Sequence, residues 1–444
     1  MPTARDAVDH DKPPVRALYI HTPFCVHKCH YCDFYSIVDT QDRQEAFCDR
    51  LVHELRTLAP HTGGLPLQTI FVGGGTPSLL GPQRWARLLD AMALLFDLSL
   101  MRAQTSTADL IHHPSPLPPL LPIGEFTVEC NPESATADLM AVLAAGGVNR
   151  VSVGAQSFNL HHLKTLERWH NPDNVFRAIH AARDAGIRRQ SLDLIYAIPG
   201  QTLEEWRSDL TIALSAGTTH LSCYNLTYEA NTAMTARMNA GQFTPIDEEL
   251  EIQMFELTHE MLQSSGLMRY EVSNYALPGH ECRHNMAYWR QQQWLAAGPS
   301  ASGHVYASHD SLDGGFRWKQ TPRLGDYLAG SGGPEASWYS PLADLEKPDP
   351  ARAIRERLMT GLRLAEGIDR AAILEGAERA SPGSMDRLLA RAKPYLDRGL
   401  LIDAQGRWRL SDVAMLRADG IAADLMRAVV SHKTTNVNSM DRSV

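Results

Sequence analysis

The sequence predicts an α/β fold built on a parallel sheet, and three observations lead to this prediction. Short apolar runs recur along the first half of the chain, a helix-like stretch follows each run, and polar residues gather just past the ends of the runs. Six runs have the length and composition of buried strands: ALYIH at 17–21, TIFVG at 69–73, EFTVE at 125–129, RVSVG at 150–154, SLDLI at 191–195 and HLSCY at 220–224.

The stretches between these runs are amphipathic or rich in Ala and Leu, which predicts helices. They are residues 42–59, 82–96, 135–146, 174–186 and 202–217. Strand–helix alternation with right-handed crossovers gives either an open doubly wound sheet or a barrel, and periodicity alone does not decide between them.

The rest of the chain divides by composition and pattern. The predicted parts are a disordered N-terminal extension at 1–16, a core domain at 17–230 with a mobile proline-rich surface insertion at 98–124, a mixed region at 231–345 that packs on the core, a small helical or winged-helix-like domain at 346–430, and a disordered tail at 431–444. The short strand or wing of the C-terminal domain is expected at WRLSD.

Composition excludes several classes of protein. Of 444 residues, 44% are hydrophobic and 21% charged, which is typical of a soluble globular chain. A net charge of −9 without a dense basic run argues against nucleic-acid binding, and no stretch is long and apolar enough to span a membrane. The seven cysteines do not fit a secreted disulfide framework, so we expect reduced thiols and a cytoplasmic location.

Three of these cysteines lie close together in HTPFCVHKCHYCDFYS, residues 21–36. Cys25, Cys29 and Cys32 have the spacing C-x3-C-x2-C, and no fourth cysteine follows nearby. Zinc would need a fourth ligand, which one of the three histidines in this stretch can supply. A 4Fe-4S cubane held by three cysteines would instead leave one iron open, which implies chemistry at that iron.

Polar groups follow the carboxyl ends of the predicted strands, the face on which α/β barrels carry their active sites. The glycines of GGGTPS let a ligand approach backbone amides, although a tight turn explains them as well. Glu129 and Asp193 are charges inside apolar strands and need a ligand, a cation or a structural salt bridge. Arg168 can anchor a carboxylate bidentately.

At this point the residues resemble the radical S-adenosylmethionine (SAM) superfamily. Within it, the chain is similar to the oxygen-independent coproporphyrinogen III oxidase family through YIHTPFCVHKCHYCDFYS, FVGGGTPS, GVNRVSVGAQSFN and LDLIYAIPGQT. The resemblance extends over residues 17–430. It implies a partial (β/α)6 TIM-like barrel of the radical SAM type, with a 4Fe-4S cluster at its open face and a smaller, mostly helical C-terminal domain.

The resemblance also implies roles for individual residues. Cys25, Cys29 and Cys32 would ligate three irons while SAM chelates the fourth, and an electron donor would reduce the cluster to cleave SAM. The family positions that contact this SAM are matched by Tyr19, Gly74 and Glu129, and those that line a second SAM in the oxidase are matched by Tyr31, Gly75, Thr76, Gln156, Arg168, Asp193 and Thr227.

Two features favour the haem chaperone subgroup, HemW, over the oxidase. The oxidase has a further cysteine two residues after the third ligand, where this chain has Phe34. HNMAYW fits the HNxxYW motif of the chaperones, which implies haem binding by His284, Tyr288 and Trp289. Outside the family context, a packed histidine beside two core aromatics would explain the motif better.

The sequence therefore predicts a haem chaperone with a 4Fe-4S cluster, SAM and haem as cofactors, and with a haem-acceptor protein and an electron donor as partners. The alternative is oxidative decarboxylation of coproporphyrinogen III, so the residues leave open whether the chain is an enzyme. The identity of the acceptor, the binding of a second SAM and the oligomeric state are also left open.

Overall fold

The computed structural model describes residues 13–102, 124–330 and 342–430. Most of the proline-rich stretch 98–124, most of the N-terminal extension 1–16 and the tail 431–444 lie outside these ranges. The described start of the proline-rich stretch is a short helix, α3 (Ser99–Arg102), which buries Met101 in the core.

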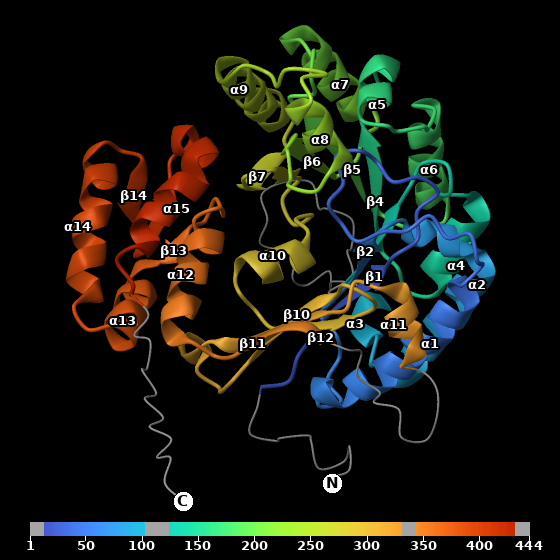
Figure 1. Ribbon diagram of the computed structural model, residues 1–444, viewed down its shortest axis with the longest axis horizontal. Coiled ribbons are helices and arrows are strands. Elements are labelled where there is room, and N and C mark those ends of the chain that lie inside the picture. Colours follow the sequence, from blue (N-terminus) through green and yellow to red (C-terminus); the bar gives the residue numbers. More distant parts are fainter. Residues whose placement is uncertain (1–12, 103–123, 331–341, 431–444) are drawn as a thin grey trace, which may run out of the picture.

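Six parallel strands, adjacent in chain order, form the centre of the molecule (Figure 1). They are β1 (Ala17–Thr22), β2 (Thr69–Gly74), β3 (Glu125–Cys130), β4 (Arg150–Gln156), β5 (Arg189–Tyr196) and β6 (His220–Asn225). Each pairs in parallel with the next. All six coincide with the apolar runs that the sequence predicts as strands, and their nearly continuous burial follows from cover on both faces.

Three further strands extend this sheet at its edges, where the sequence pattern did not predict them. β9 (Leu295–Ala297) pairs in parallel with β1, while β8 (Asn274–Ala276) pairs antiparallel with β6 and with β7 (Met268–Glu271). Part of the mixed region therefore belongs to the sheet itself. These strands have only three or four residues, too few for a clear hydrophobic period.

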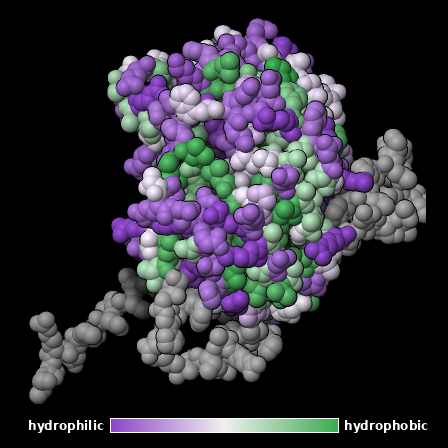
Figure 2. Space-filling model, turned by 90° about the vertical axis from the view of Figure 1, so that its right-hand side faces the viewer, coloured by the Kyte–Doolittle hydropathy of each residue, from purple (hydrophilic) through white to green (hydrophobic). Residues whose placement is uncertain are grey.

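Helices cover the outside of the parallel strands (Figure 1). They are α1 (Gln44–Leu58), α2 (Gly81–Leu95), α4 (Ala137–Ala145), α5 (Leu160–Thr165), α6 (Asp173–Asp184) and α7 (Leu203–Ser215), with 3-10 turns at Ala59–Thr62 and Pro77–Leu80. A capping box of Thr202 and Glu205 starts α7. Figure 2 views the molecule from the right of Figure 1, and there hydrophilic side chains surround separate apolar patches, as expected for helices that turn their apolar face inward.

Along the chain, the next elements connect the parallel strands to the C-terminal part. They are α8 (Ala233–Asn239), α9 (Glu248–Ser264), α10 (Arg283–Trp289), β10 (Ser302–Tyr306), a 3-10 turn at Ser311–Asp313, β11 (Gly315–Gln320), α11 (Leu324–Ala329) and β12 (Leu342–Glu346). β10, β11 and β12 form a separate antiparallel sheet. Among the described helices, none combines the length and apolar character needed to cross a membrane.

The C-terminal part is mostly helical and lies at the left of Figure 1. It contains α12 (Pro350–Gly361), β13 (Ile368–Asp369), α13 (Arg370–Ala380), α14 (Ser384–Asp397), β14 (Leu401–Ala404), β15 (Arg407–Leu410), a 3-10 turn at Asp412–Arg417 and α15 (Ala418–Met426). The strand expected at WRLSD is β15, which lies between β13 and β14.

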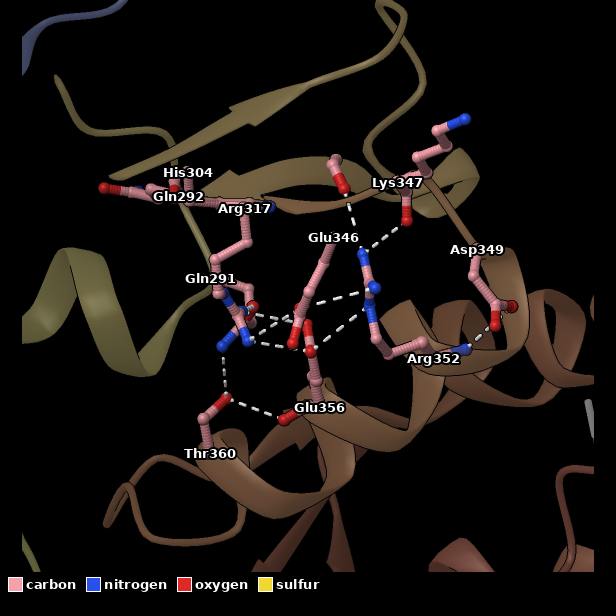
Figure 3. Close-up of polar contacts among 11 residues, drawn as sticks. Gln291, Gln292, His304, Arg317, Glu346, Lys347, Asp349, Arg352, Glu356 and Thr360 are labelled. Atoms are coloured by element: carbon pink, nitrogen blue, oxygen red, sulfur yellow. Dashed lines mark hydrogen bonds and ion pairs between the residues drawn. The ribbon is translucent and has the colours of Figure 1, made fainter. Parts of the chain in front are cut away.

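An ion network joins the small sheet to this C-terminal part (Figure 3). Arg317 of β11 donates to both carboxylate oxygens of Glu356 of α12, at 2.8 and 3.0 Å. Arg352 lies 3.5 Å from the same carboxylate and 3.3 Å from Glu346 of β12. Since the Glu356 side chain is only 15% exposed, the network fixes α12 against the sheet more firmly than surface ion pairs would.

Candidate functional site

A cavity of about 460 Å³ opens at the carboxyl ends of the parallel strands, and we call it the cluster cavity. It receives side chains from the loop after β1 and from the ends of β2 to β6. The residues that line it include Cys25, His27, Cys29, Tyr31, Cys32, Gly74, Gly75, Thr76, Glu129, Ser152, Gly154, Gln156, Arg168, Asp193, Tyr224 and Thr227. The sequence pattern predicted this face, because only there do the loops of every strand–helix unit meet.

The three cysteines of the loop all line this cavity and are partly exposed, whereas the other four cysteines are buried. The Cys25 Sγ lies 3.6 Å from Thr76 Oγ1, and the Cys32 amide donates to the Cys29 carbonyl. Burial raises the pKa of the Cys25 thiol, and it raises that of Cys32 to about 11. A bound metal would reverse this, because a coordinating thiol is deprotonated.

A single metal ion and a cluster place different demands on these thiols. In the part of the chain that the structure describes, no three His, Cys, Asp or Glu side chains converge as a mononuclear metal site requires. In a cubane, each of the three thiolates would instead bind a different iron. His21 is an unsuitable fourth zinc ligand, since its Nδ1 is hydrogen-bonded to Tyr19 and its Nε2 to the Tyr35 carbonyl.

The glycines of GGGTPS bring backbone close to the cavity wall. Gly74 has a φ of +105°, and a Cβ there would lie 2.5 Å from the His21 ring. A Cβ at Gly75 would lie 2.6 Å from the Phe24 carbonyl oxygen, and one at Gly73 would lie 2.7 Å from Glu129 Oε2. Glycine is therefore required by close approach at all three positions and by backbone conformation at Gly74.

Two half-buried carboxyl groups, Glu129 and Asp193, face the cavity. The Gly74 amide donates to Glu129 Oε2 at 3.1 Å, and Ser152 Oγ lies 3.0 Å from both Asp193 oxygens. Burial, together with the nearby charge of Asp193, raises the pKa of Glu129 to about 8. Burial also raises the pKa of Asp193, although hydrogen bonds from Ser222 and Ser152 oppose the shift. A cationic ligand would remove this conflict between two carboxylates.

Arg168 brings a cation beside the cysteine loop. Its Nη2 donates to the Gly154 carbonyl at 2.9 Å, and its Nη1 lies 3.8 Å from Cys29 Sγ. A Cβ at Gly154 would lie 2.8 Å from Arg168 Nη2 and from Gln156 Nε2. Gln156 follows a register shift in β4 and has a φ of +62°, a strained conformation of the kind found at functional sites.

Nine of the ten positions matched to SAM contacts line the cluster cavity, and Tyr19 does not. Tyr19 lies beneath the cavity, where its hydroxyl is hydrogen-bonded to His21 at 3.0 Å and its ring stacks on Phe71 and His284.

Ser152, Gly154 and Tyr224 also line the cavity, and they were not predicted from the sequence. Two-residue periodicity was a usable signal, since Ser152, Gly154 and Gln156 alternate along β4.

The HNxxYW residues all lie in α10, near the amino ends of β2 and β3. His284 is fully buried, with Nδ1 2.9 Å from Thr69 Oγ1 and Nε2 2.8 Å from the Tyr288 hydroxyl. Burial lowers the pKa of His284 to about 4, so the ring is neutral. The Trp289 ring lies under the Arg363 guanidinium at 5.2 Å. In this conformation both nitrogens of His284 are engaged by protein groups.

Glu125 holds the start of α10. Its carboxylate accepts hydrogen bonds from the backbone amides of Arg283 and His284, both at 3.2 Å. Burial would raise the pKa of Glu125, but Arg150, Arg189 and these amides outweigh it and lower the pKa. Glu125 is thus an ionised cap that couples the barrel to the HNxxYW helix.

Comparisons with known proteins agree with this geometry. Residues 19–212 match the Radical SAM superfamily, and residues 349–417 match the HemN C-terminal domain. The chain is 33% identical to "Heme chaperone HemW" of Mycobacterium tuberculosis over 415 residues, which are 92% of this chain and 94% of the relative. It is 31% identical to "Heme chaperone HemW" of Lactococcus lactis, over 89% of this chain and 93% of that one.

A solved structure of coproporphyrinogen III oxidase (HemN) from Escherichia coli has the same fold, with a TM-score of 0.74 and 20% identity over 95% of this chain and 92% of that chain. The predicted fold of a radical SAM barrel with a C-terminal helical part is confirmed. The chain belongs to the heme chaperone HemW family of radical SAM proteins.

Proposed function

We propose that this protein is a haem chaperone that holds a 4Fe-4S cluster, binds SAM beside it, and binds haem for transfer to an acceptor protein. The observation that carries the proposal is the meeting of Cys25, Cys29 and Cys32 with cationic and anionic side chains in one cavity. The names of the similar proteins support the haem part.

The cluster cavity has the groups that a zwitterionic, sulfonium-bearing ligand needs. Glu129 and Asp193 would face its cationic part, Arg168 would face its carboxylate, and the amides of the glycine turn would approach it closely. When bound, a reduced cluster supplies the electron that cleaves the sulfonium of SAM. An electron-donor protein would be needed upstream, in a compartment that keeps thiols reduced.

Haem binding is proposed at the HNxxYW helix, with His284, Tyr288 and Trp289 as the residues involved. A neutral imidazole is the form that ligates iron. Iron could reach His284 only after its hydrogen bond to Thr69 or to Tyr288 is exchanged. We therefore expect haem binding to be coupled to a local rearrangement of α10.

A haem titration tests this proposal. Anaerobically reconstituted protein should bind haem and give a Soret band that His284→Ala shifts or weakens. His304→Ala is a matched control, because His304 is also buried and hydrogen-bonded, to the Gln292 carbonyl at 2.9 Å. Identical spectra for wild type and His284→Ala would remove His284 from the haem site.

The competing function is oxidative decarboxylation of coproporphyrinogen III. It would require product formation by the reduced protein with SAM in the absence of oxygen. Phe34 stands where the oxidase has a further cysteine, and it lies 61% exposed beside the cluster cavity. We expect no decarboxylated product, and accumulation of product would replace the chaperone proposal.

A further inference from the structure

A second, open cavity of about 620 Å³ lies near the opposite end of the parallel strands. Thr69, which begins β2, lines it, whereas Gly74, which ends β2, lines the cluster cavity. The two positions are about 17 Å apart along the strand. The two cavities share no lining residue, and we call this second one the α10 groove.

The α10 groove combines basic and apolar side chains with two glutamates, Glu281 and Glu366. Three arginines line it: Arg269 from β7, Arg283 from α10 and Arg290 just after α10. Leu100, Met268 and Met286 supply apolar and thioether surface between them. Its volume falls within the range of about 300–1,000 Å³ that is typical of small-molecule clefts.

One of the arginines, Arg290, is held by an exchangeable acidic partner. Arg290 donates to Glu366 at 2.9 and 3.0 Å in a pair that is 44% and 40% exposed. The exposed Arg290–Glu366 pair contributes about 0–1 kcal/mol, so a ligand carboxylate can replace Glu366 at little cost. Arg269 pairs with Asp412, but the Arg269 side chain is only 3% exposed, so this arginine is fixed in the wall of the groove.

The groove also reaches the HNxxYW histidine. Thr69 lines the groove, and its hydroxyl is the group bonded to His284 Nδ1 at 2.9 Å. Met286, two residues after His284, lines the same groove. A single hydroxyl therefore separates a buried imidazole from the groove, and a thioether, a known haem ligand, lies on its wall.

We propose that the α10 groove is the haem-docking site, with its arginines binding the two propionates and its methionines contacting the macrocycle. The proposal rests on the haem binding proposed above and adds its location and the basis of its preference for a dicarboxylate. Arg283 and Arg290 are the principal propionate partners, because both belong to the HNxxYW segment. Met286 or, after displacement of Thr69, His284 lies within reach of the iron.

The test uses the full-length, anaerobically reconstituted protein and titrates it with haem and with haem dimethyl ester. Wild type should bind haem at least 10-fold more tightly than the ester. The double variant Arg283→Gln/Arg290→Gln should lose most of this preference, with a 10-fold or greater rise in the haem Kd. The control Arg177→Gln/Arg188→Gln removes the same charge from exposed positions at α6 and before β5 and should behave as wild type.

The outcomes separate this inference from the proposed function. If wild type binds no haem, the proposed function and the groove assignment both fall. A second outcome is that wild type binds haem and that wild type and the double variant show the same ratio of ester Kd to haem Kd. That outcome overturns only the groove assignment. If the double variant is unstable, the wild-type comparison can still overturn the groove assignment, because a wild type that binds the ester as tightly as haem makes no use of the propionates. The single variant Arg290→Gln, at a 44% exposed position, then carries the positive test of the groove.

Discussion

The pH dependence of SAM binding should depend on Glu129. Burial and the charge of Asp193 raise the pKa of Glu129 to about 8, so the carboxyl is protonated in the ligand-free protein below that pH. A cationic ligand needs the ionised form. Each pH unit below 8 therefore costs about 1.36 kcal/mol of binding free energy.

The magnitude follows from this shift. Between pH 6 and pH 8 the cost of ionising Glu129 falls by up to about 2.7 kcal/mol, which is roughly a 100-fold gain in SAM affinity. Water in the cavity screens the carboxyl and reduces the gain, so we expect a change of about 10-fold to 100-fold. Glu129→Gln keeps the shape and cannot ionise, so the contribution of Glu129 to the pH dependence should be absent from its affinity.

Equilibrium dialysis of radiolabelled SAM, without reductant and oxygen, measures this effect. The titration of the ligand itself is common to both proteins and cancels in the ratio of their dissociation constants. Parallel pH profiles for wild type and Glu129→Gln would refute the assignment of Glu129 to the cationic part of the ligand.

Three further predictions concern residues around the site. Gly154→Ala should displace the Arg168 guanidinium, because the new Cβ would lie 2.8 Å from Arg168 Nη2. We expect SAM binding to weaken about 10-fold and the free energy of unfolding to fall by about 1 kcal/mol. Gly325→Ala, with open space around it, is the control, and unchanged SAM affinity in Gly154→Ala would contradict this role of Gly154. Glu125→Gln should destabilise the protein by about 3–5 kcal/mol in urea unfolding at pH 7, because it leaves Arg150 and Arg189 without their carboxylate. The pKa of Glu125 is lower in the folded protein than in the unfolded chain. The stability difference between wild type and Glu125→Gln should therefore be complete above the pKa of the unfolded chain and shrink as the pH falls through the pKa of the folded protein. A stability difference that does not change with pH would contradict an ionised cap. Glu356→Gln should lower the free energy of unfolding by about 1–3 kcal/mol, because it weakens the network of Figure 3. The control Asp397→Asn, in an exposed pair with Lys393, should lower it by less than about 1 kcal/mol. Equal decreases in urea unfolding would contradict a special role for the network.

The six parallel strands could be predicted because burial on both faces leaves a continuous apolar run. The exceptions within those runs were equally informative. Glu129 and Asp193 interrupt apolar strands, and both face the cluster cavity. The cysteine loop and the glycine turn were predictable for a related reason, since their residue types are explained by a ligand or by close backbone approach.

The edge strands could not be predicted in this way, because their pairing depends on distant segments. Leu295–Ala297 forms β9 only through its alignment with β1, which lies near the start of the chain. The assignment of Tyr19 to the ligand site came from resemblance and stays a prediction; its side chain contacts His21 and Phe71 and is not among the residues that line the cavity.

The environment of HNMAYW was also beyond the sequence. The motif gives no sign that Thr69 and Glu125, from two barrel strands, bond to His284 and to the start of its helix. The interpretation as a packed histidine therefore describes the local geometry, while the family resemblance supplies the haem hypothesis.

The most direct test of the central claim is an anaerobic assay of iron and sulfide, with electron paramagnetic resonance of the reduced protein before and after SAM is added. We predict about four iron and four sulfide per chain, and a signal that SAM changes. Alanine at Cys25, Cys29 or Cys32 should abolish the cluster, whereas Cys48→Ala, at a buried thiol that does not line the cluster cavity, should retain it. One zinc per chain, full iron content after loss of any of the three cysteines, or a signal indifferent to SAM would contradict the claim.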